Sequence, residues 1–401
     1  MARARHGARR GRVLTGPAAR AALLGCAVLT AFVAACERRQ PSPQEYLRAA
    51  WEDYKKVYVM EPGYVLDQTR GDGEAISEGQ GYALLRAAWM CDEPAFDRIF
   101  AWVEANLRRP DGLYSWTWSA RTGRLIDFNT ATDGDQEIAF ALILAAHAFA
   151  RPALEARARE LLVAIRTHEA IEVPGGWFPA AGNWAVAERI VNLSYFIPYA
   201  YADFARVDPD GRWDEVTRTG YALLERVLQG PGVVLPPDFM VVNPDGSIAP
   251  LPESSKLGRE FSFDAMRLYF RVALDCAFTG RPEACDGPLR ADALVEMLRR
   301  DGAIYTRYAT SGRPLSSDES LSFYGGVLPL LERQAPAYAR HLREGKLSLA
   351  ELATISTRPD RYYDLNWLWF GIAAAEGLLA QSADLRCAAS AAAPAGRPAG
   401  S

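Results

Sequence analysis

The sequence predicts an all-α protein, built as an α/α barrel of two concentric rings of helices. Roughly a dozen helical segments alternate in character: some are apolar on every face and others have one polar face, as inner and outer rings require. No run of alternating apolar and polar residues is long enough to indicate a sheet core. The 401 residues are 49% apolar and 23% charged, an ordinary globular composition, and no long linker divides the interior. We therefore expect one large domain.

The expected helices follow one another from residue 43 to residue 379. The amphipathic segments are Pro43–Val57, Pro94–Arg108, Pro152–His168, Trp213–Leu228 and Pro288–Arg300. The apolar segments begin at Ser77 and then cover Asp133–Ala150, Leu193–Ala205, Ser262–Cys276, Ser320–Leu331 and Tyr363–Leu379. Their apolar residues recur at helical spacing, and Ser77 and Thr132 are the residue types that cap helix N-termini.

The ends of the chain differ from this central part. Residues 1–35 hold six arginines, no acid and then the apolar run Ala21–Ala35, which is too short for a confident membrane span. Val33-Ala34-Ala35-Cys36 resembles a bacterial lipobox, which implies a signal peptide over 1–35, lipid on Cys36 and a tether over 36–42. The alternative is an ordinary signal peptide with a chance cysteine. The domain is expected over 43–381, and the Ala-, Pro- and Gly-rich residues 382–401 are expected to be disordered.

Charge and cysteine content restrict the partners and the location. Removing the six arginines changes the formal net charge from −4 to about −10, which disfavours nucleic acid and polyanions and favours neutral or cationic substrates. We expect an exported lipoprotein, with Glu37 after the lipidated residue indicating the outer membrane. Disulfides persist there, and Cys276 and Cys285 flank a short loop that suits one; Cys91 and Cys387 have no evident partner. The four scattered histidines argue against a metal site, and no cofactor is expected.

Acidic residues stand at the starts of three expected inner helices. Glu78, Asp133 and Asp264 each fall within a first turn, and Ala131–Glu137 alone contains three acids. A capping box would explain one such acid, but not three before a helix that is apolar all round. Inner helices of such a barrel run the same way, so these carboxylates should meet at one mouth.

Two carboxyl groups in an aromatic-walled groove are the equipment of glycoside hydrolysis. Aromatic residues are frequent at loop positions, and sugar rings stack on such faces. Trp116, Trp118, Trp184 and Tyr363 are the expected sugar platforms. Trp177 fits core packing and sugar binding equally well.

Five motifs, in order along the chain, carry a resemblance to glycoside hydrolase family 8. They are Ser77-Glu78-Gly79-Gln80-Gly81-Tyr82, the run from Ala131-Thr132-Asp133-Gly134-Asp135 to Phe149, Asn192-Leu193-Ser194-Tyr195-Phe196, Phe263-Asp264-Ala265-Met266-Arg267 and Tyr362-Tyr363-Asp364. The resemblance implies an (α/α)6 barrel with six inner and six outer helices. It also implies an inverting endo-β-1,4-glucanase, a cellulase-like enzyme.

Roles follow from the matched positions. The resemblance implies that Glu78 is the general acid, that Asp264 is the base that deprotonates water, and that Asp133 binds and distorts the sugar at the cleavage point. It further implies that Tyr195 orients the water and that Arg267 keeps Asp264 ionised. Burial and the charge of Asp133 must raise the pKa of Glu78 against the helix dipole if the acid is to work.

Two departures from the family pattern bear on the substrate. Leu193 replaces a proline and Phe263 replaces a tyrosine before the base. A β-1,4-glucan is the expected substrate, in exopolysaccharide production or remodelling, with chitosan, xylan or a mixed exopolysaccharide as alternatives. A catalytically silent carbohydrate-binding subunit is a third hypothesis. The expected partners are the polysaccharide, a membrane reached through Cys36 and an exopolysaccharide secretion machinery, and the expected oligomeric state is a monomer.

Overall fold

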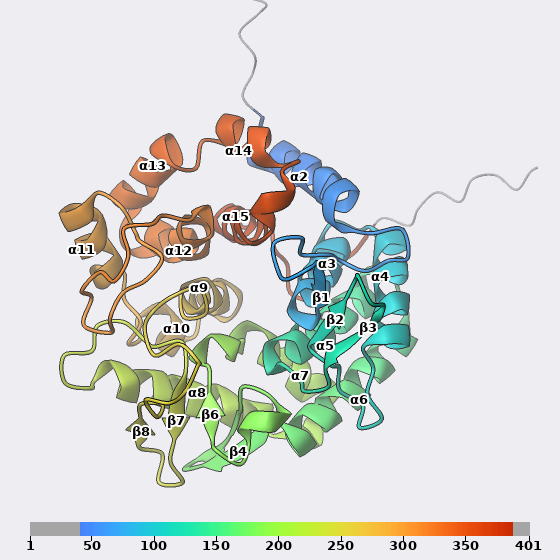
Figure 1. Ribbon diagram of the computed structural model, residues 1–401, viewed down its shortest axis with the longest axis horizontal. Coiled ribbons are helices and arrows are strands. Elements are labelled where there is room, and N and C mark those ends of the chain that lie inside the picture. Colours follow the sequence, from blue (N-terminus) through green and yellow to red (C-terminus); the bar gives the residue numbers. More distant parts are fainter. Residues whose placement is uncertain (1–40, 388–401) are drawn as a thin grey trace, which may run out of the picture. The chain divides into compact units, whose positions relative to one another are not determined.

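Two concentric rings of helices make up the part of the chain that the structure, a computed structural model, describes: residues 41–387. Figure 1 shows the inner ring surrounded by the outer one. The outer helices are α2 (Pro43–Tyr58), α4 (Glu93–Asn106), α6 (Pro152–His168), α8 (Trp213–Leu228), α11 (Asp292–Asp301) and α13 (Pro336–Gly345). The inner helices are α3 (Ser77–Trp89), α5 (Thr132–Ala148), α7 (Pro198–Val207), α9 (Arg267–Thr279), α12 (Leu321–Gln334) and α15 (Tyr362–Ala375). The predicted barrel of six inner and six outer helices is confirmed for these residues.

The apolar pattern of each helix explains its ring. In α5 every residue except His147 is buried, because neighbouring helices cover all of its faces. In α2 the buried residues form one stripe, which includes Trp51 and Tyr54, and the opposite face meets solvent. Burial of apolar surface on both sides of the inner ring therefore drives the two-layer arrangement.

The inner ring closes between its last helix and its first. The guanidinium of Arg86 in α3 donates a hydrogen bond from Nη2 to Asn366 Oδ1 of α15 at 2.6 Å, and the ring of Tyr82 meets Trp367 edge-on at 5.6 Å. The neighbouring pair α12 and α15 touches backbone to backbone, since a Cβ on Gly371 would overlap the carbonyl oxygen of Gly325. Contacts between residues some 280 positions apart thus hold the first and last inner helices together.

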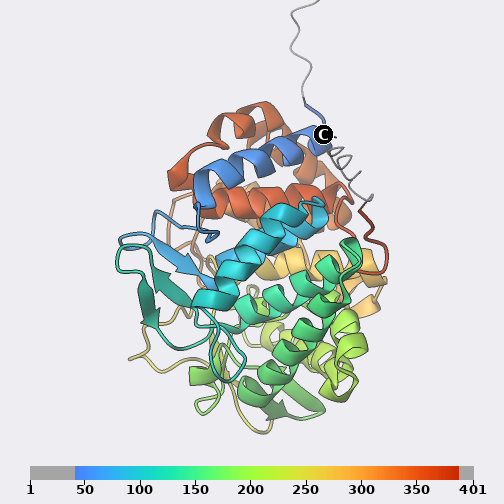
Figure 2. The ribbon, with the colours of Figure 1, turned by 90° about the vertical axis from the view of Figure 1, so that its right-hand side faces the viewer.

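Short antiparallel strands, absent from the sequence prediction, occupy loops that lead into inner helices. One sheet has the order β1–β2–β3, one pairs β4 with β5, and one has the order β6–β7–β8. Their bounds are β1 Glu74–Ile76, β2 Thr117–Ser119, β3 Arg124–Asp127, β4 Ala170–Val173, β5 Gly176–Pro179, β6 Ile190–Val191, β7 Met240–Val242 and β8 Ile248–Ala249. Strands β1–β3 lie at one end of the barrel in Figure 2. Because β1 continues directly into α3, this end is the mouth where inner helices begin.

Several predicted boundaries are wrong. Ser77 and Thr132 do not cap their helices: the cap positions are Ile76 and Ala131, and the Thr132 hydroxyl donates to Ala180 O at 2.7 Å instead. Helix α7 begins at Pro198, after a short 3₁₀ turn that includes Tyr195. The predicted start of α9 at Ser262 is also too early, since the helix begins at Arg267. Helices α10 (Pro282–Cys285) and α14 (Leu349–Ile355), like α13, were not predicted.

Two disulfides join the described cysteines. The predicted bond between Cys276 and Cys285 is confirmed. Cys91 bonds to Cys387, which ties the turn after α3 to the end of the described chain. The expected disorder from residue 382 is therefore wrong at its start, because Ser382 is buried and hydrogen-bonded to Asp203 and Cys387 is cross-linked.

The remaining predictions for the chain ends concern residues outside the described range. The signal peptide, Cys36 and residues 36–40 of the tether precede it, and residues 388–401 follow it. Within residues 41–387, no helix has the length and apolar character needed to cross a membrane.

Candidate active site

One buried guanidinium, that of Arg267 at the start of α9, joins the three acids that the sequence places at helix starts. Its Nη1 donates to Glu78 Oε2 at 2.5 Å and to Asp133 Oδ2 at 2.9 Å. Its Nη2 donates to Asp264 Oδ1. The acids come from three separate parts of the sequence and meet, as expected, at the mouth of the barrel.

The first turns of α3 and α5 bring Glu78 and Asp133 together. Gly134 follows Asp133, and a Cβ on it would lie 2.9 Å from the backbone nitrogen of Glu78 and would overlap the hydroxyl of Ser77. Only a residue without a side chain lets the two turns approach this closely. The glycine of the acidic run therefore has a packing reason to be there.

Asp264 reaches the site from a turn and not from a helix. The turn Ser262–Met266 closes through Met266 N to Ser262 O at 3.1 Å, and Arg267 N then donates to Asp264 O at 3.1 Å. The side chain of Asp264 is 32% exposed, that of Glu78 is 16% exposed, and that of Asp133 is 2% exposed. Glu78 and Asp264 are thus open to a ligand, whereas Asp133 lies beneath them.

The electrostatics separate the two accessible acids. Burial raises the pKa of Glu78 to about 7; the guanidinium of Arg267 opposes this rise, and Asp133 and Asp264 reinforce it. Burial also raises the pKa of Asp264, with Arg267 again opposing and Asp133 adding to the rise. Glu78 consequently keeps its proton up to neutral pH, which is the property a general acid needs. Asp264 is the more exposed of the two, and the side chain of Asn192 favours its charged form, so it is the better placed to accept a proton.

The three acids of the α5 start have different surroundings, and only Asp133 faces the site. Asp135 accepts a hydrogen bond from Tyr114 N at 2.9 Å, away from Arg267. Glu137 lies one turn deeper and pairs with Arg271, whose Nη2 donates to its Oε1 at 2.6 Å. Both carboxyls have a raised pKa, chiefly because they are buried. A second ion pair therefore supports the site from within the barrel.

The predicted aromatic residues divide into two groups. Tyr195 lies under the site, with the Arg267 guanidinium 5.3 Å from the centre of its ring. Tyr363 donates from its hydroxyl to Phe263 O at 2.8 Å, directly beside Asp264. Trp184 is 36% exposed, in a 3₁₀ turn before β6, and is free to stack on a ligand.

The other tryptophans are less accessible. Trp116 is half-buried and donates from Nε1 to Asp127 Oδ2 at 3.0 Å. Trp118 is buried because it points inward from β2 and packs on Tyr64 and Trp102, so its prediction as a sugar platform is wrong. Trp177 is likewise a core residue.

Sequence reasoning assigned no role to two polar residues beside Asp264. Asn192 accepts at its Oδ1 from Ser194 N at 2.9 Å and Ser194 Oγ at 2.7 Å, and its side chain favours the charged form of Asp264. Asp238 contacts the turn that carries Asp264. Asn192 belongs to a recognisable motif, whereas Asp238 follows two prolines in an ordinary loop and gives no sequence signal.

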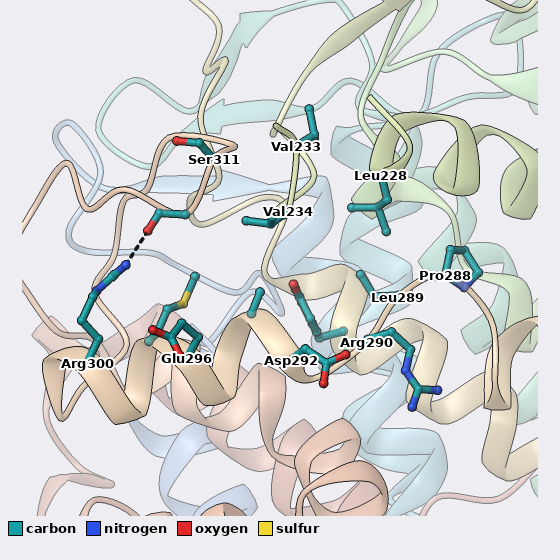
Figure 3. Close-up of a pocket in the computed structure, with 14 residues that line it drawn as sticks. Leu228, Val233, Val234, Pro288, Leu289, Arg290, Asp292, Glu296, Arg300 and Ser311 are labelled. Atoms are coloured by element: carbon teal, nitrogen blue, oxygen red, sulfur yellow. Dashed lines mark hydrogen bonds between the residues drawn. The ribbon is translucent and has the colours of Figure 1, made fainter. Parts of the chain in front are cut away.

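Residues 41–387 contain no cluster of three or more side chains that would hold a metal ion. A cavity of about 470 Å³ lies between the end of α8, α11 and the loop around Ser311 (Figure 3). None of the site residues lines it, and its walls include Val233, Val234 and Arg300, which donates to Gly312 O at 3.2 Å. The acidic site is thus separate from this cavity.

A barrel of paired helices with a proton-holding carboxyl beside a second, more exposed one has the features of an enzyme that hydrolyses glycosidic bonds. The family model described as glycosyl hydrolases family 8 matches residues 20–363. The chain belongs to this family.

Named relatives and a solved structure are consistent with this family membership. The chain is 31% identical over 235 residues to a protein of Cellulomonas uda named endoglucanase, with 56% of this chain and 63% of that protein covered. It is 32% identical over 261 residues to a probable endoglucanase of Novacetimonas hansenii, covering 62% and 73% of the two chains. The structure of endo-β-1,4-glucanase CMCax from Acetobacter xylinum superposes with a TM-score of 0.66 at 25% identity, covering 84% of this chain and all of that one. The chain spans about three fifths of the length of several of these curated relatives.

Proposed function

We propose that this chain is an inverting endo-glycosidase that cleaves β-1,4-linked glucan chains. The observation that carries the proposal is the set of three carboxyls around Arg267, in which Glu78 has a pKa of about 7 and Asp264 stays accessible. The relatives named endoglucanases support the substrate class.

In the proposed reaction Glu78 gives its proton to the glycosidic oxygen as the bond from that oxygen to the anomeric carbon breaks. Asp264 takes a proton from a water molecule, whose oxygen bonds to the anomeric carbon from the opposite face. Asp133, whose side chain is only 2% exposed, acts in this proposal through its charge on Glu78 rather than by direct contact with the sugar, and Arg267 keeps Asp264 charged. Each turnover then releases two shorter chains, and the new reducing end has inverted configuration.

Electrostatics explain why Arg267 suits this cycle. A guanidinium presents several donors in a fixed plane, and here it contacts all three acids at once. When Glu78 loses its proton and Asp264 gains one, the number of negative charges around Arg267 stays the same. The catalytic step therefore leaves the net charge of the cluster around Arg267 unchanged.

The test is hydrolysis of cellulose-like glucan, lichenan, xylan and chitosan in parallel by the purified full chain. We expect release of reducing ends from the β-1,4-glucan and its loss, by at least 100-fold, in Glu78→Gln and in Asp264→Asn. Glu93→Gln is the matched control, since Glu93 stands in the first turn of outer helix α4. Full activity of Glu78→Gln would contradict the assignment, binding without hydrolysis would favour a silent carbohydrate-binding subunit, and preference for another polysaccharide would correct the substrate.

We also propose that the protein is exported and lipidated on Cys36, and acts in exopolysaccharide production at the outer membrane. The basic and apolar N-terminus, the lipobox-like residues before Cys36 and the two disulfides support this location. Metabolic labelling with a fatty acid tests it: the full chain should incorporate label and Cys36→Ser should not. Label in the Cys36→Ser variant would contradict the proposal.

A further inference from the structure

The turn that carries Asp264 is held from behind by a buried aspartate, Asp238. Its Oδ1 accepts hydrogen bonds from Ser262 N at 2.9 Å and from Ala265 N at 2.8 Å, and its Oδ2 accepts one from the Ser262 hydroxyl. The donors stand on both sides of Phe263 and Asp264. A single carboxyl is therefore hydrogen-bonded to the turn on both sides of the base.

The loop around Asp238 fixes this carboxyl before it meets the turn. Asp238 N donates to Glu260 O at 2.8 Å, and Phe239 N donates to Gly258 O at 3.1 Å. A Cβ on Gly258 would lie 2.8 Å from Asp238 Oδ2, so the glycine makes room for the carboxyl. Asp238 is 3% exposed, and solvent does not compete for its hydrogen bonds.

The position of Asp264 depends on these hydrogen bonds because the residue lies outside α9. Its turn is closed by backbone hydrogen bonds such as that from Met266 N to Ser262 O at 3.1 Å, and the flanking Phe263, although 41% exposed, packs edge-on against Phe323 and Tyr363. Arg267 holds the carboxylate of Asp264 from the front. Asp238 binds the backbone of Ser262 and Ala265, on both sides of the base, in addition to the hydrogen bond from the Tyr363 hydroxyl to Phe263 O.

We propose that Asp238 is a positioning residue for hydrolysis, which fixes the turn Ser262–Met266 so that the carboxylate of Asp264 points at the attacking water. The proposal rests on the proposed function of Asp264 as the base. Asp238 itself does not touch the substrate in this account.

The protonation of Asp238 determines which substitution preserves its role. Burial, and next the charge of Asp264, raise the pKa of Asp238 to about 7, so the group is largely neutral below that pH. A neutral carboxyl and an asparagine side chain have nearly the same shape, and both have an oxygen that accepts from Ser262 N and Ala265 N. The second polar atom of either side chain, Oδ2 of the aspartate or Nδ2 of the asparagine, lies next to the Ser262 hydroxyl. Asparagine should therefore keep the turn in place, and alanine should release it.

The test compares Asp238→Asn, Asp238→Ala and the control Asp275→Ala at pH 6 on a soluble cello-oligosaccharide. Asp275 is also a buried aspartate with a raised pKa, accepts from the Tyr221 hydroxyl at 2.6 Å and lies in the last turns of α9, away from Arg267. We expect Asp238→Ala to lower kcat at least 20-fold with KM within twofold of the wild type. Asp238→Asn should keep kcat within threefold, and Asp275→Ala should lower thermal stability without changing kcat.

Amide hydrogen exchange supplies a measurement that needs no activity. Exchange in the peptide containing Ser262–Met266 should accelerate at least tenfold in Asp238→Ala and stay near the wild-type rate in Asp238→Asn. An unchanged kcat and exchange rate in Asp238→Ala, or a raised KM at unchanged kcat, would overturn the inference. If the wild-type chain cleaves no polysaccharide, the proposed function fails, and the exchange rates still decide whether Asp238 fixes the turn.

Discussion

Asp133 should set the upper end of the working pH range through its charge. Asp133 and Glu78 both contact Nη1 of Arg267, at 2.9 and 2.5 Å, so their carboxyl oxygens face each other across one nitrogen. Two negative charges ~5 Å apart repel by about 3 kcal/mol at an effective dielectric constant of ~20. Because Arg267 neutralises part of this repulsion, we expect Asp133→Asn to lower the pKa of Glu78 by about 1–2 units, at ~1.4 kcal/mol per unit.

The direction in which the basic limb of the pH–rate profile moves follows from the role of Glu78. As a general acid it works only while protonated, so activity falls as the pH rises through its pKa of about 7. Removing the like charge of Asp133 lowers that pKa and moves the basic limb of the pH–rate profile to lower pH. The assay is kcat/KM against pH on an unactivated cello-oligosaccharide, whose leaving oxygen needs the proton of Glu78, together with the NMR titration of the Glu78 carboxyl carbon. A basic limb that stays in place or moves upward in Asp133→Asn would refute the coupling.

Four further substitutions test other features of the site and of the fold. Arg267→Lys should lower kcat at least 100-fold in steady-state assays, because an ammonium cannot hold Glu78, Asp133 and Asp264 in one plane as the guanidinium does; activity near the wild-type level would contradict this role. Trp184→Ala should raise KM at unchanged melting temperature, because its ring is exposed. Trp118→Ala should instead cost about 3–5 kcal/mol of unfolding free energy in denaturant titrations, because its ring is buried. The reverse result would mean that Trp118 binds the sugar and that Trp184 belongs to the core. Cys387→Ser opens a cross-link between residues 296 positions apart and should lower the unfolding free energy by about 2–5 kcal/mol at unchanged kcat, and an unchanged melting temperature in calorimetry would show that the bond adds no stability.

The sequence was sufficient to predict the two rings and the meeting of the acids. Apolar residues on every face identify an inner helix such as α5, and inner helices of an α/α barrel begin at one mouth. That reasoning places Glu78 and Asp133 correctly, because both lie in true first turns. It also predicted the bond between Cys276 and Cys285, which lie close together in the sequence.

Tertiary contacts decided the features that sequence reasoning missed. Thr132 has the right chemistry for a cap, but its hydroxyl bonds to Ala180 O from a distant loop. Asp264 lies before α9 because Asp238 and Arg267 stabilise a turn there. Strands of two to four residues are too short for an alternating pattern to be visible, and the burial of Trp118 follows from one of them. The bond between Cys91 and Cys387 depends on how the whole ring closes.

Glu78 and Asp264 are proposed to cleave a β-linked glucan in one displacement by water. The most direct measurement is proton NMR of the first products released from a β-1,4-linked cello-oligosaccharide by the full chain. A single displacement makes the new reducing end the α-anomer at first, and the β-anomer then grows by mutarotation. Initial release of the β-anomer would mean a double displacement and would contradict the roles given to both carboxyls.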